Sequence, residues 1–172
     1  MSRRQTRRRL AARLLGVLAL AFVVASPPAV SAESEAGQKL PRFVSLHSDQ
    51  VNLRVGPGEN YPIEWVLTRK EMPVEIVKEF ENWRMIRDWQ GTEGWVHERM
   101  LTGKRAVVIK GGVRTLHRQP DPASPAVARA QPGVIAKLLE CRAEWCRIDA
   151  ADHAGWVQRG DLWGVYPDEI VQ

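Results

Sequence analysis

The segments NWRMI at residues 82–86 and GWV at residues 94–96 decide the fold, because both recur further along the chain. EWCRI stands at residues 144–148 and GWV again at residues 155–157, so each tryptophan reappears 61 or 62 positions later. Tryptophan is rare, and four of them in register are not expected by chance. Such a period indicates a repeated unit, and this one is long enough to be a small closed domain rather than one turn of a solenoid.

Short runs of strand-forming residues make up each copy. Val51, Leu53 and Val55 alternate with polar residues, which is the period of a half-buried strand. The turn-forming residues Gly56-Pro57-Gly58 end this run. Further strands are expected at residues 73–77, 83–87 and 94–97, with a hairpin tip at residues 88–91. Roughly five short strands in about 60 residues, without a helical stripe, predict an all-β fold of two tandem small barrels.

The amino terminus has the features of a secretory signal. Arginines crowd residues 3–13, no acid precedes Glu33, and an uninterrupted apolar run spans residues 14–25. Prolines and the small residues Val30-Ser31-Ala32 follow, so we expect cleavage after Ala32. A retained membrane anchor is the alternative, but a span needs roughly 20 apolar residues. The general secretory route is favoured over the twin-arginine route, because Thr6-Arg7 stands where twin-arginine signals usually carry apolar residues.

This plan divides the chain into five parts. We expect a signal peptide at residues 1–32, a linker at 33–41, two small barrels at 42–104 and 106–167, and a tail at 168–172. The whole chain has 25 basic and 20 acidic residues, a net charge of +5. Removing six arginines with the signal leaves 19 basic and 20 acidic residues, a net charge of −1. We therefore expect an exported protein, periplasmic or secreted, with no nucleic-acid partner and no membrane span after cleavage.

Cys141 and Cys146 flank the expected hairpin tip around residues 142–145. Their strands run antiparallel and side by side, and export would place them in an oxidising compartment, so we predict a disulfide. A zinc site with His117 and His153 is the alternative. It is disfavoured because the two cysteines are spaced loosely for a zinc pair and no second pair exists.

The first copy carries Glu79 and Arg84 where the second carries the cysteines. A cross-strand ion pair at these positions is expected to be a weak substitute for a disulfide. A cysteine peptidase would need its nucleophile in a domain of its own, and both cysteines lie in the second repeat. The proline of Gly56-Pro57-Gly58 removes a backbone donor that a phosphate cradle would need. We therefore predict no catalytic residue, no cofactor and no metal.

The first copy resembles the bacterial SH3 (SH3b) family. The resemblance rests on Asn52-Leu53-Arg54-x-Gly56-Pro57-Gly58, then Tyr61-Pro62, Trp83 and Gly94-Trp95-Val96. The two copies together are similar to exported two-repeat SH3-like proteins of alphaproteobacterial type. In the second copy Val113-Arg114 aligns with Leu53-Arg54 at an offset of 60, which requires an insertion afterwards. The resemblance implies a non-catalytic module that recognises cell-wall peptidoglycan or peptide partners.

Seven tryptophans raise the question of a ligand site. The four that recur in register are expected to pack the barrels, and Trp163 is expected to seal the carboxyl end together with Tyr166. The candidate ligand-binding residues are Arg54, Asn60, Tyr61, Trp65 and Trp89. Aromatic rings with a polar fringe stack on a sugar or a peptide. The alternative interpretation places Trp65 in the core and Trp89 against the other barrel.

Two functions therefore remain open. The first is an envelope binding module that recognises peptidoglycan, through its peptide stems. The second is an interaction or scaffold subunit of the periplasm whose ligand is an envelope protein. The sequence does not separate them, and it leaves the oligomeric state open.

Overall fold

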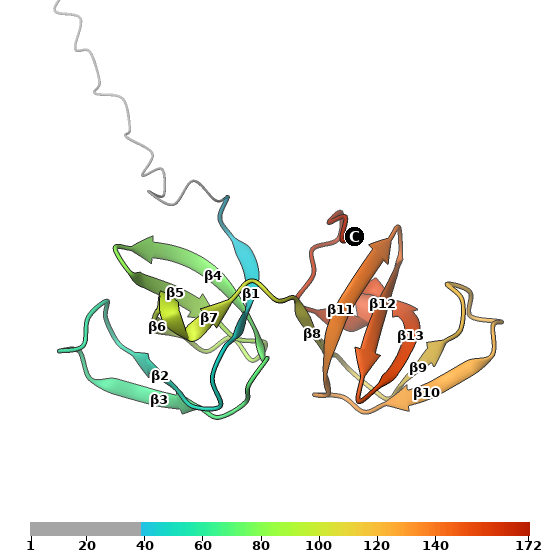
Figure 1. Ribbon diagram of the computed structural model, residues 1–172, viewed down its shortest axis with the longest axis horizontal. Coiled ribbons are helices and arrows are strands. Elements are labelled where there is room, and N and C mark those ends of the chain that lie inside the picture. The colour runs from blue at the N-terminus through green and yellow to red at the C-terminus, as the bar shows by residue number, and fades with distance from the viewer. Residues whose placement is uncertain (1–38) are drawn as a thin grey trace, which may run out of the picture. The chain divides into compact units, whose positions relative to one another are not determined.

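The computed structural model describes residues 39–172, and no α-helix occurs within this range (Figure 1). The chain forms two antiparallel sheets of seven strands each, which we call barrel 1 and barrel 2. The predicted signal peptide lies outside the described residues, as does most of the linker at residues 33–41. The prediction of two all-β units in tandem is confirmed.

Barrel 1 has the strand order β3-β2-β6-β5-β4-β1-β7. A short 3-10 turn, Glu98–Met100, leads into its last strand. Its strands are β1 (Arg42–Leu46), β2 (Val51–Arg54), β3 (Ile63–Leu67), β4 (Pro73–Phe80), β5 (Trp83–Arg87), β6 (Glu93–His97) and β7 (Leu101–Thr102). Strand β2 therefore ends one residue before the predicted Val55, whose side chain is exposed.

Barrel 2 repeats this arrangement strand for strand, in the order β10-β9-β13-β12-β11-β8-β14. A second 3-10 turn, Arg159–Asp161, again precedes the last strand. Its strands are β8 (Ala106–Ile109), β9 (Arg114–His117), β10 (Ala126–Ala130), β11 (Ile135–Arg142), β12 (Trp145–Ala150), β13 (His153–Gln158) and β14 (Leu162–Trp163). No helix in the described part of the chain has the length and apolar character needed to cross a membrane.

The pairing of strands corrects the predicted alignment of the two copies. Arg54 lies opposite Trp95 in barrel 1, and His117 lies opposite Trp156 in barrel 2. Arg54 therefore corresponds to His117 at an offset of 63, not to Arg114 at an offset of 60. The predicted insertion is not needed, because the same offset continues through β3 and β10. The register follows from packing: a Cβ on Gly94 would strike Leu53, and a Cβ on Gly155 would strike Leu116.

The two cores are mainly aliphatic. Leu53, Ile76 and Ile86 are among the fully buried side chains of barrel 1, and Leu116 and Ile148 are among those of barrel 2. The four recurring tryptophans are predicted to pack the barrels, and none of them belongs to the two core clusters. Trp156 is buried, whereas the other three are only half-buried.

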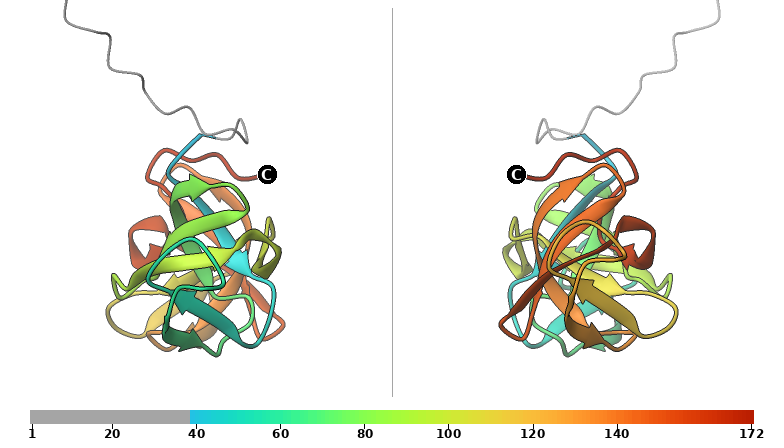
Figure 2. Two further views of the ribbon diagram at one scale, coloured as in Figure 1. Left: turned by 90° about the vertical axis from the view of Figure 1, so that its left-hand side faces the viewer. Right: turned by 90° about the vertical axis from the view of Figure 1, so that its right-hand side faces the viewer.

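The segment after β14 returns to the end of β11, where Val171 forms an isolated antiparallel bridge with Cys141. Figure 2 shows this segment in red, ending at the label C. The amide of Cys141 donates a hydrogen bond to the Val171 carbonyl at 2.9 Å. Trp163 and Tyr166 were predicted to seal the carboxyl end, but both rings instead contact Phe43 of β1, at centroid distances of 5.0 and 4.6 Å. The Tyr166 hydroxyl also donates to Glu75 at 2.8 Å. The end of the chain therefore joins barrel 2 to barrel 1.

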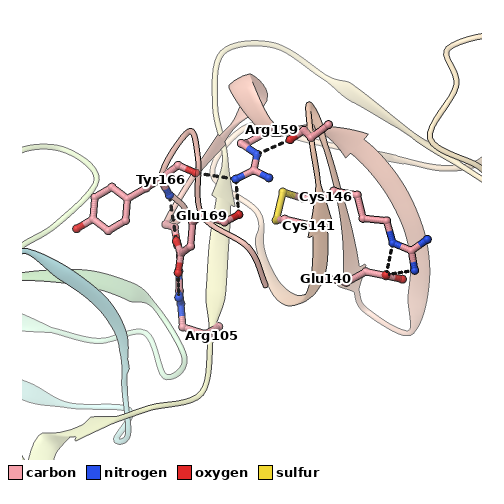
Figure 3. The surroundings of a disulfide bond; sticks show 10 residues. Arg105, Glu140, Cys141, Cys146, Arg159, Tyr166 and Glu169 are labelled. Carbon is pink, nitrogen blue, oxygen red and sulfur yellow. Dashed lines mark hydrogen bonds and ion pairs between the residues drawn. A yellow bond between two sulfur atoms is a disulfide. The ribbon is translucent and has the colours of Figure 1, made fainter. Parts of the chain in front are cut away.

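Cys141 and Cys146 lie directly opposite each other on β11 and β12 and form a disulfide (Figure 3). The prediction is confirmed, and the zinc alternative, which needs free thiolates, falls. In barrel 1 the same two positions pair Glu79 with Arg84 across β4 and β5. The Arg84 Nε lies 3.3 Å from the Glu79 carboxylate, and Arg42 reaches that carboxylate at 2.5 Å. Both side chains of the pair are nearly buried, so removing either one would leave a buried charge without its partner.

Arg159 holds the carboxyl-terminal segment in place (Figure 3). Its side chain is buried and donates to the carbonyls of Ala143, Tyr166 and Glu169 at 2.7–2.8 Å. Arg105 forms an ion pair with the Glu169 carboxylate. Burial alone would raise the pKa of Glu169, but the hydrogen bonds from Arg105 and from the Tyr166 amide outweigh it and hold that pKa below its ordinary value.

Candidate functional site

The loop between β2 and β3 is built around one tyrosine ring. A Cβ added to Gly56 would lie 2.3 Å from Cδ1 of Tyr61, and one added to Gly58 would lie 3.2 Å from Cδ2 of the same ring. Both glycines are therefore needed to let the ring lie against the turn. Tyr61 remains 40% exposed, so its other face is open to solvent. Asn60 is exposed beside it.

Arg54 fastens this loop to the barrel. Its Nη1 donates to the carbonyl of Glu59 at 3.0 Å and to the carbonyl of Tyr61 at 2.7 Å. In barrel 2, His117 does the same work from the corresponding position: its Nδ1 lies 2.9 Å from the Ser124 carbonyl. A carbonyl only accepts, so Nδ1 carries the proton. The guanidinium of Arg54 is therefore committed first to positioning the loop.

A hollow of about 230 Å³ lies beside this loop on barrel 1. Trp83, at the start of β5, forms one wall, and its ring packs edge-on against His97 with a centroid distance of 5.4 Å. The hollow is lined by Gln50, Asn52, Arg54, Glu59, Trp83, His97, Arg99 and Met100. An aromatic wall with several charged and amide groups around it can hold a polar ligand with an apolar face.

Barrel 2 has a hollow of the same volume in the same place. Trp145 takes the position of Trp83 and packs edge-on against His117 at 5.8 Å. The two histidines do not correspond, because His97 ends β6 whereas His117 ends β9. An imidazole therefore packs against the tryptophan in both barrels, but it comes from β6 in barrel 1 and from β9 in barrel 2. The lining residues are Val113, Arg114, Thr115, His117, Pro122, Trp145, Val157, Gln158 and Asp161.

The hairpin of β2 and β3 exposes an unusual amount of apolar surface. Trp65 is 57% exposed, so the alternative that placed it in the core is wrong. The exposed apolar side chains are Val55, Tyr61, Ile63, Trp65 and Val66, which we call the barrel 1 patch. The corresponding residues of barrel 2 are Arg118, Ser124, Ala126, Ala128 and Arg129. The fold does not require the patch, because barrel 2 forms the same hairpin without it.

Trp89 lies apart from the other predicted site residues. It stands at the tip of the β5–β6 hairpin and is 37% exposed. The predicted hairpin tip is confirmed: the Asp88 carboxylate accepts hydrogen bonds from the amides of Gln90 and Thr92 at 2.9 and 2.8 Å. Of the five predicted residues, four therefore share the β2–β3 hairpin, and Trp89 belongs to another hairpin.

Trp83 and His97 line the hollow but are not among the predicted site residues. The signal was present, since Trp83 and Trp145 both open a strand directly after a two-residue turn. A residue at such a strand end is less enclosed than one at the centre. Within residues 39–172, no group of three or more His, Cys, Asp or Glu side chains is arranged to hold a metal.

Comparison with known families decides the identity of both repeats. The profile of the bacterial SH3 domain matches residues 47–103 and again residues 111–164. The chain belongs to the bacterial SH3 family. Both matched segments fall on the two barrels and contain the two hollows. Bacterial SH3 domains are typically cell-wall binding modules and are not catalytic in themselves.

Solved structures similar to this bacterial SH3 protein include three larger proteins. NlpC2 and NlpC1 from Trichomonas vaginalis are each 12% identical, with TM-scores of 0.35 and 0.33, and the alignments cover 77% and 80% of this chain and 51% of each of theirs. An NlpC/P60 family protein from Bacillus cereus ATCC 10987 is also 12% identical, with a TM-score of 0.32, 70% of this chain covered and 55% of that chain. This chain thus spans about half the length of each. No curated protein sequence matches it.

Proposed function

We propose that this protein is an exported, non-catalytic binding module of the cell envelope, and that barrel 1 recognises peptidoglycan through its peptide stems. One observation carries the proposal: barrel 1 exposes five large apolar side chains on a hairpin where barrel 2 has arginine, serine and alanine. Exposing them lowers solubility without helping the fold, so a partner is expected to cover them.

The proposed site combines the hollow with the loop above it. Arg54 lines the hollow and also holds the loop, so Asn60 and Tyr61 stand at its edge. A peptide stem offers carboxylates, amides and short apolar side chains. We propose that Arg54, Asn60 and Tyr61 contact the stem. Trp65 on the β2–β3 hairpin and Trp89 on the β5–β6 hairpin extend this contact.

Two features support export, one expected from the sequence and one present in the structure. The predicted signal peptide directs the chain out of the cytoplasm, and the disulfide fits an oxidising compartment. Mass spectrometry of the protein purified from the envelope tests the signal directly. A chain beginning at Glu33 is expected, and a chain that keeps residues 1–32 contradicts the assignment.

Sedimentation with purified insoluble peptidoglycan tests the binding function. The exported protein is expected in the pellet, and removal of the peptide stems from the wall should return it to the supernatant. Tyr61→Ser and Trp65→Ala install the residues that barrel 2 has at the same positions, and each should weaken binding by about tenfold if it is a hot spot. Val127→Ser, which changes an exposed valine of barrel 2, is the matched control. Protein that stays in the supernatant at low and high salt excludes the proposal.

A protein ligand is the second candidate, and one observation favours it. Strand β3 is the last strand of its sheet, so the outward-facing amides and carbonyls of Ile63–Leu67 have no strand beside them. An extended segment of an envelope protein can add to such an edge. Under this function the protein should fail to pellet with purified wall. Chemical cross-linking should instead join it to an envelope protein, and Trp65→Ala should abolish that cross-link.

A further inference from the structure

The β9–β10 hairpin of barrel 2 differs in charge from its counterpart in barrel 1. Residues 47–67 carry three acids and one arginine, a net charge of −2. The corresponding residues 110–130 carry four cations and one acid, a net charge of +3 with histidine neutral. The cations are Lys110, Arg114, Arg118 and Arg129. Two repeats with the same backbone thus present opposite charges at the same place.

The change of charge coincides with the loss of the barrel 1 patch. Arg118 stands where barrel 1 has Val55, and Arg129 stands where it has Val66. Both arginines are exposed, and neither takes part in an ion pair among residues 39–172. The single acid of the hairpin, Asp121, accepts a hydrogen bond from the Ala123 amide at 2.8 Å. The positive charge of these two side chains is therefore uncompensated.

Two of the four cations, Arg114 and Arg129, belong to the hollow of barrel 2. Arg129 lies opposite Thr115 in the β9–β10 ladder, and partners across a ladder point to the same face. Thr115 and Arg114 line the hollow, so Arg129 stands on the face into which the hollow opens. Arg114 is paired with Asp161 at 3.1 Å, which leaves part of its guanidinium for another acceptor.

The floor of this hollow is aromatic. Trp145 is half-buried, and His117 supports it edge-on while its Nδ1 is held by the Ser124 carbonyl. An indole face held in this way can stack on a flat apolar face of a sugar ring. Guanidinium groups bind carboxylate and phosphate oxygens through charge-assisted hydrogen bonds. One ligand class, a sugar that carries a negative charge, satisfies both groups.

We propose that barrel 2 binds an acidic saccharide, with a sugar ring against Trp145 and its carboxylate or phosphate on Arg114 and Arg129. This second site differs from the proposed function in its barrel and in its ligand chemistry. The two barrels then form a module with two specificities, an apolar one for peptide and a cationic one for acidic glycan.

Titration calorimetry with defined saccharides tests the proposal on the whole exported protein. Oligogalacturonate supplies the carboxylate, a phosphorylated oligomannoside supplies the phosphate, and the methyl ester of oligogalacturonate is the neutral reference. The tighter of the two anions identifies the charged group. Binding of at least one anion and none of the ester is expected. Equal binding of the ester, or binding of neither anion, overturns the proposal.

Matched variants separate a built site from general electrostatics. Arg114→Val with Arg129→Val installs the residues that barrel 1 has at the same positions and should weaken binding by at least about tenfold. Lys70→Val with Lys78→Val removes the same charge from exposed positions of barrel 1 and should leave binding within about twofold. Equal losses in both pairs, or no loss in the arginine pair, contradict the proposal.

Two further variants test the aromatic floor and independence from barrel 1. Trp145→Phe keeps an aromatic ring but reduces the stacking face, and should weaken binding severalfold; an unchanged affinity excludes the sugar contact. Tyr61→Ser should leave saccharide binding intact even if it abolishes sedimentation with the wall. A loss of saccharide binding in Tyr61→Ser would place the ligand on barrel 1 and overturn the assignment.

Discussion

Arg84 in barrel 1 and Cys146 in barrel 2 occupy the same strand position. Each is bonded to the residue opposite it across the hairpin, Arg84 through an ion pair and Cys146 through a disulfide. Arg84 faces Glu79 and donates to the turn carbonyl of Glu81 at 2.6 Å. Where cysteine replaces it, Arg159 donates to the corresponding carbonyl, that of Ala143. With a disulfide in place of the ion pair, barrel 2 has no arginine at position 146 to bind the turn carbonyl. Arg159 binds that carbonyl instead, and the same side chain also binds the carboxyl-terminal segment.

Loss of the disulfide should destabilise barrel 2 moderately. The loop that it closes is short, so replacing Cys141 and Cys146 by serine is expected to cost about 2 kcal/mol, at the low end for disulfides. Urea unfolding of the double variant and of the reduced wild type measures this cost. Agreement between the two supports the prediction, and an unchanged midpoint in both contradicts it.

Loss of Arg84 should destabilise barrel 1 by a similar amount. The nearly buried Glu79 carboxylate keeps Arg42 as a partner but loses Arg84, so Arg84→Ala is expected to cost about 2–3 kcal/mol. Introducing cysteines at both positions 79 and 84 should recover much of the loss under oxidising conditions, because barrel 2 forms a disulfide there. A double-cysteine variant that remains reduced, or one no more stable when oxidised, refutes the equivalence.

The Tyr61 ring leaves no room for a side chain on Gly56. A Cβ there would lie 2.3 Å from the ring, so Gly56→Ala should displace Tyr61 and reduce wall binding strongly, at a cost in stability of about 1–3 kcal/mol. Gly103→Ala is the control, because a Cβ at that position of barrel 1 meets nothing within 4 Å. Tyrosine fluorescence quenching and sedimentation report both effects. Equal behaviour of the two variants would show that the ring does not depend on Gly56.

Acid should release the carboxyl-terminal segment. Because the pKa of Glu169 is held below its ordinary value of 4.5, its ionised form stabilises the folded state above that value. This contribution is lost as the pH falls through the lowered pKa. Glu169→Gln should therefore be less stable than wild type at pH 7, by less than about 1 kcal/mol because the group is partly exposed. The difference should shrink as the pH falls from 4.5 through the lowered pKa, and a difference that does not change with pH assigns the effect to something other than charge.

The strands and hairpins were predictable because their causes are local. Alternation placed Val51 and Leu53 inward, and turn residues marked the tip at residues 88–91. The disulfide followed from the same logic, since a two-residue turn at Ala143 and Glu144 places the flanking cysteines opposite each other. Periodicity and turn chemistry act over a few residues, so a single sequence is enough to recover them.

The register of the second copy was not predictable in this way. Val113-Arg114 is similar in sequence to Leu53-Arg54, but the structural counterpart of Leu53 is Leu116. Leu116 packs against Gly155, which lies almost 40 residues away in the chain. The role of Trp83 was missed for a related reason. Whether a tryptophan at a strand end faces the core or a hollow depends on how the barrel closes, which is a non-local property.

The proposed peptide site in barrel 1 is tested most directly by the indole N–H signals of the seven tryptophans. Nuclear magnetic resonance of ¹⁵N-labelled protein, titrated with soluble peptidoglycan stem peptides, follows each indole separately once single substitutions have assigned it. The signals of Trp83 and Trp65 should shift and saturate, while that of Trp145 stays in place. A titration that moves no indole signal, or moves only those of barrel 2, would contradict peptide recognition by barrel 1.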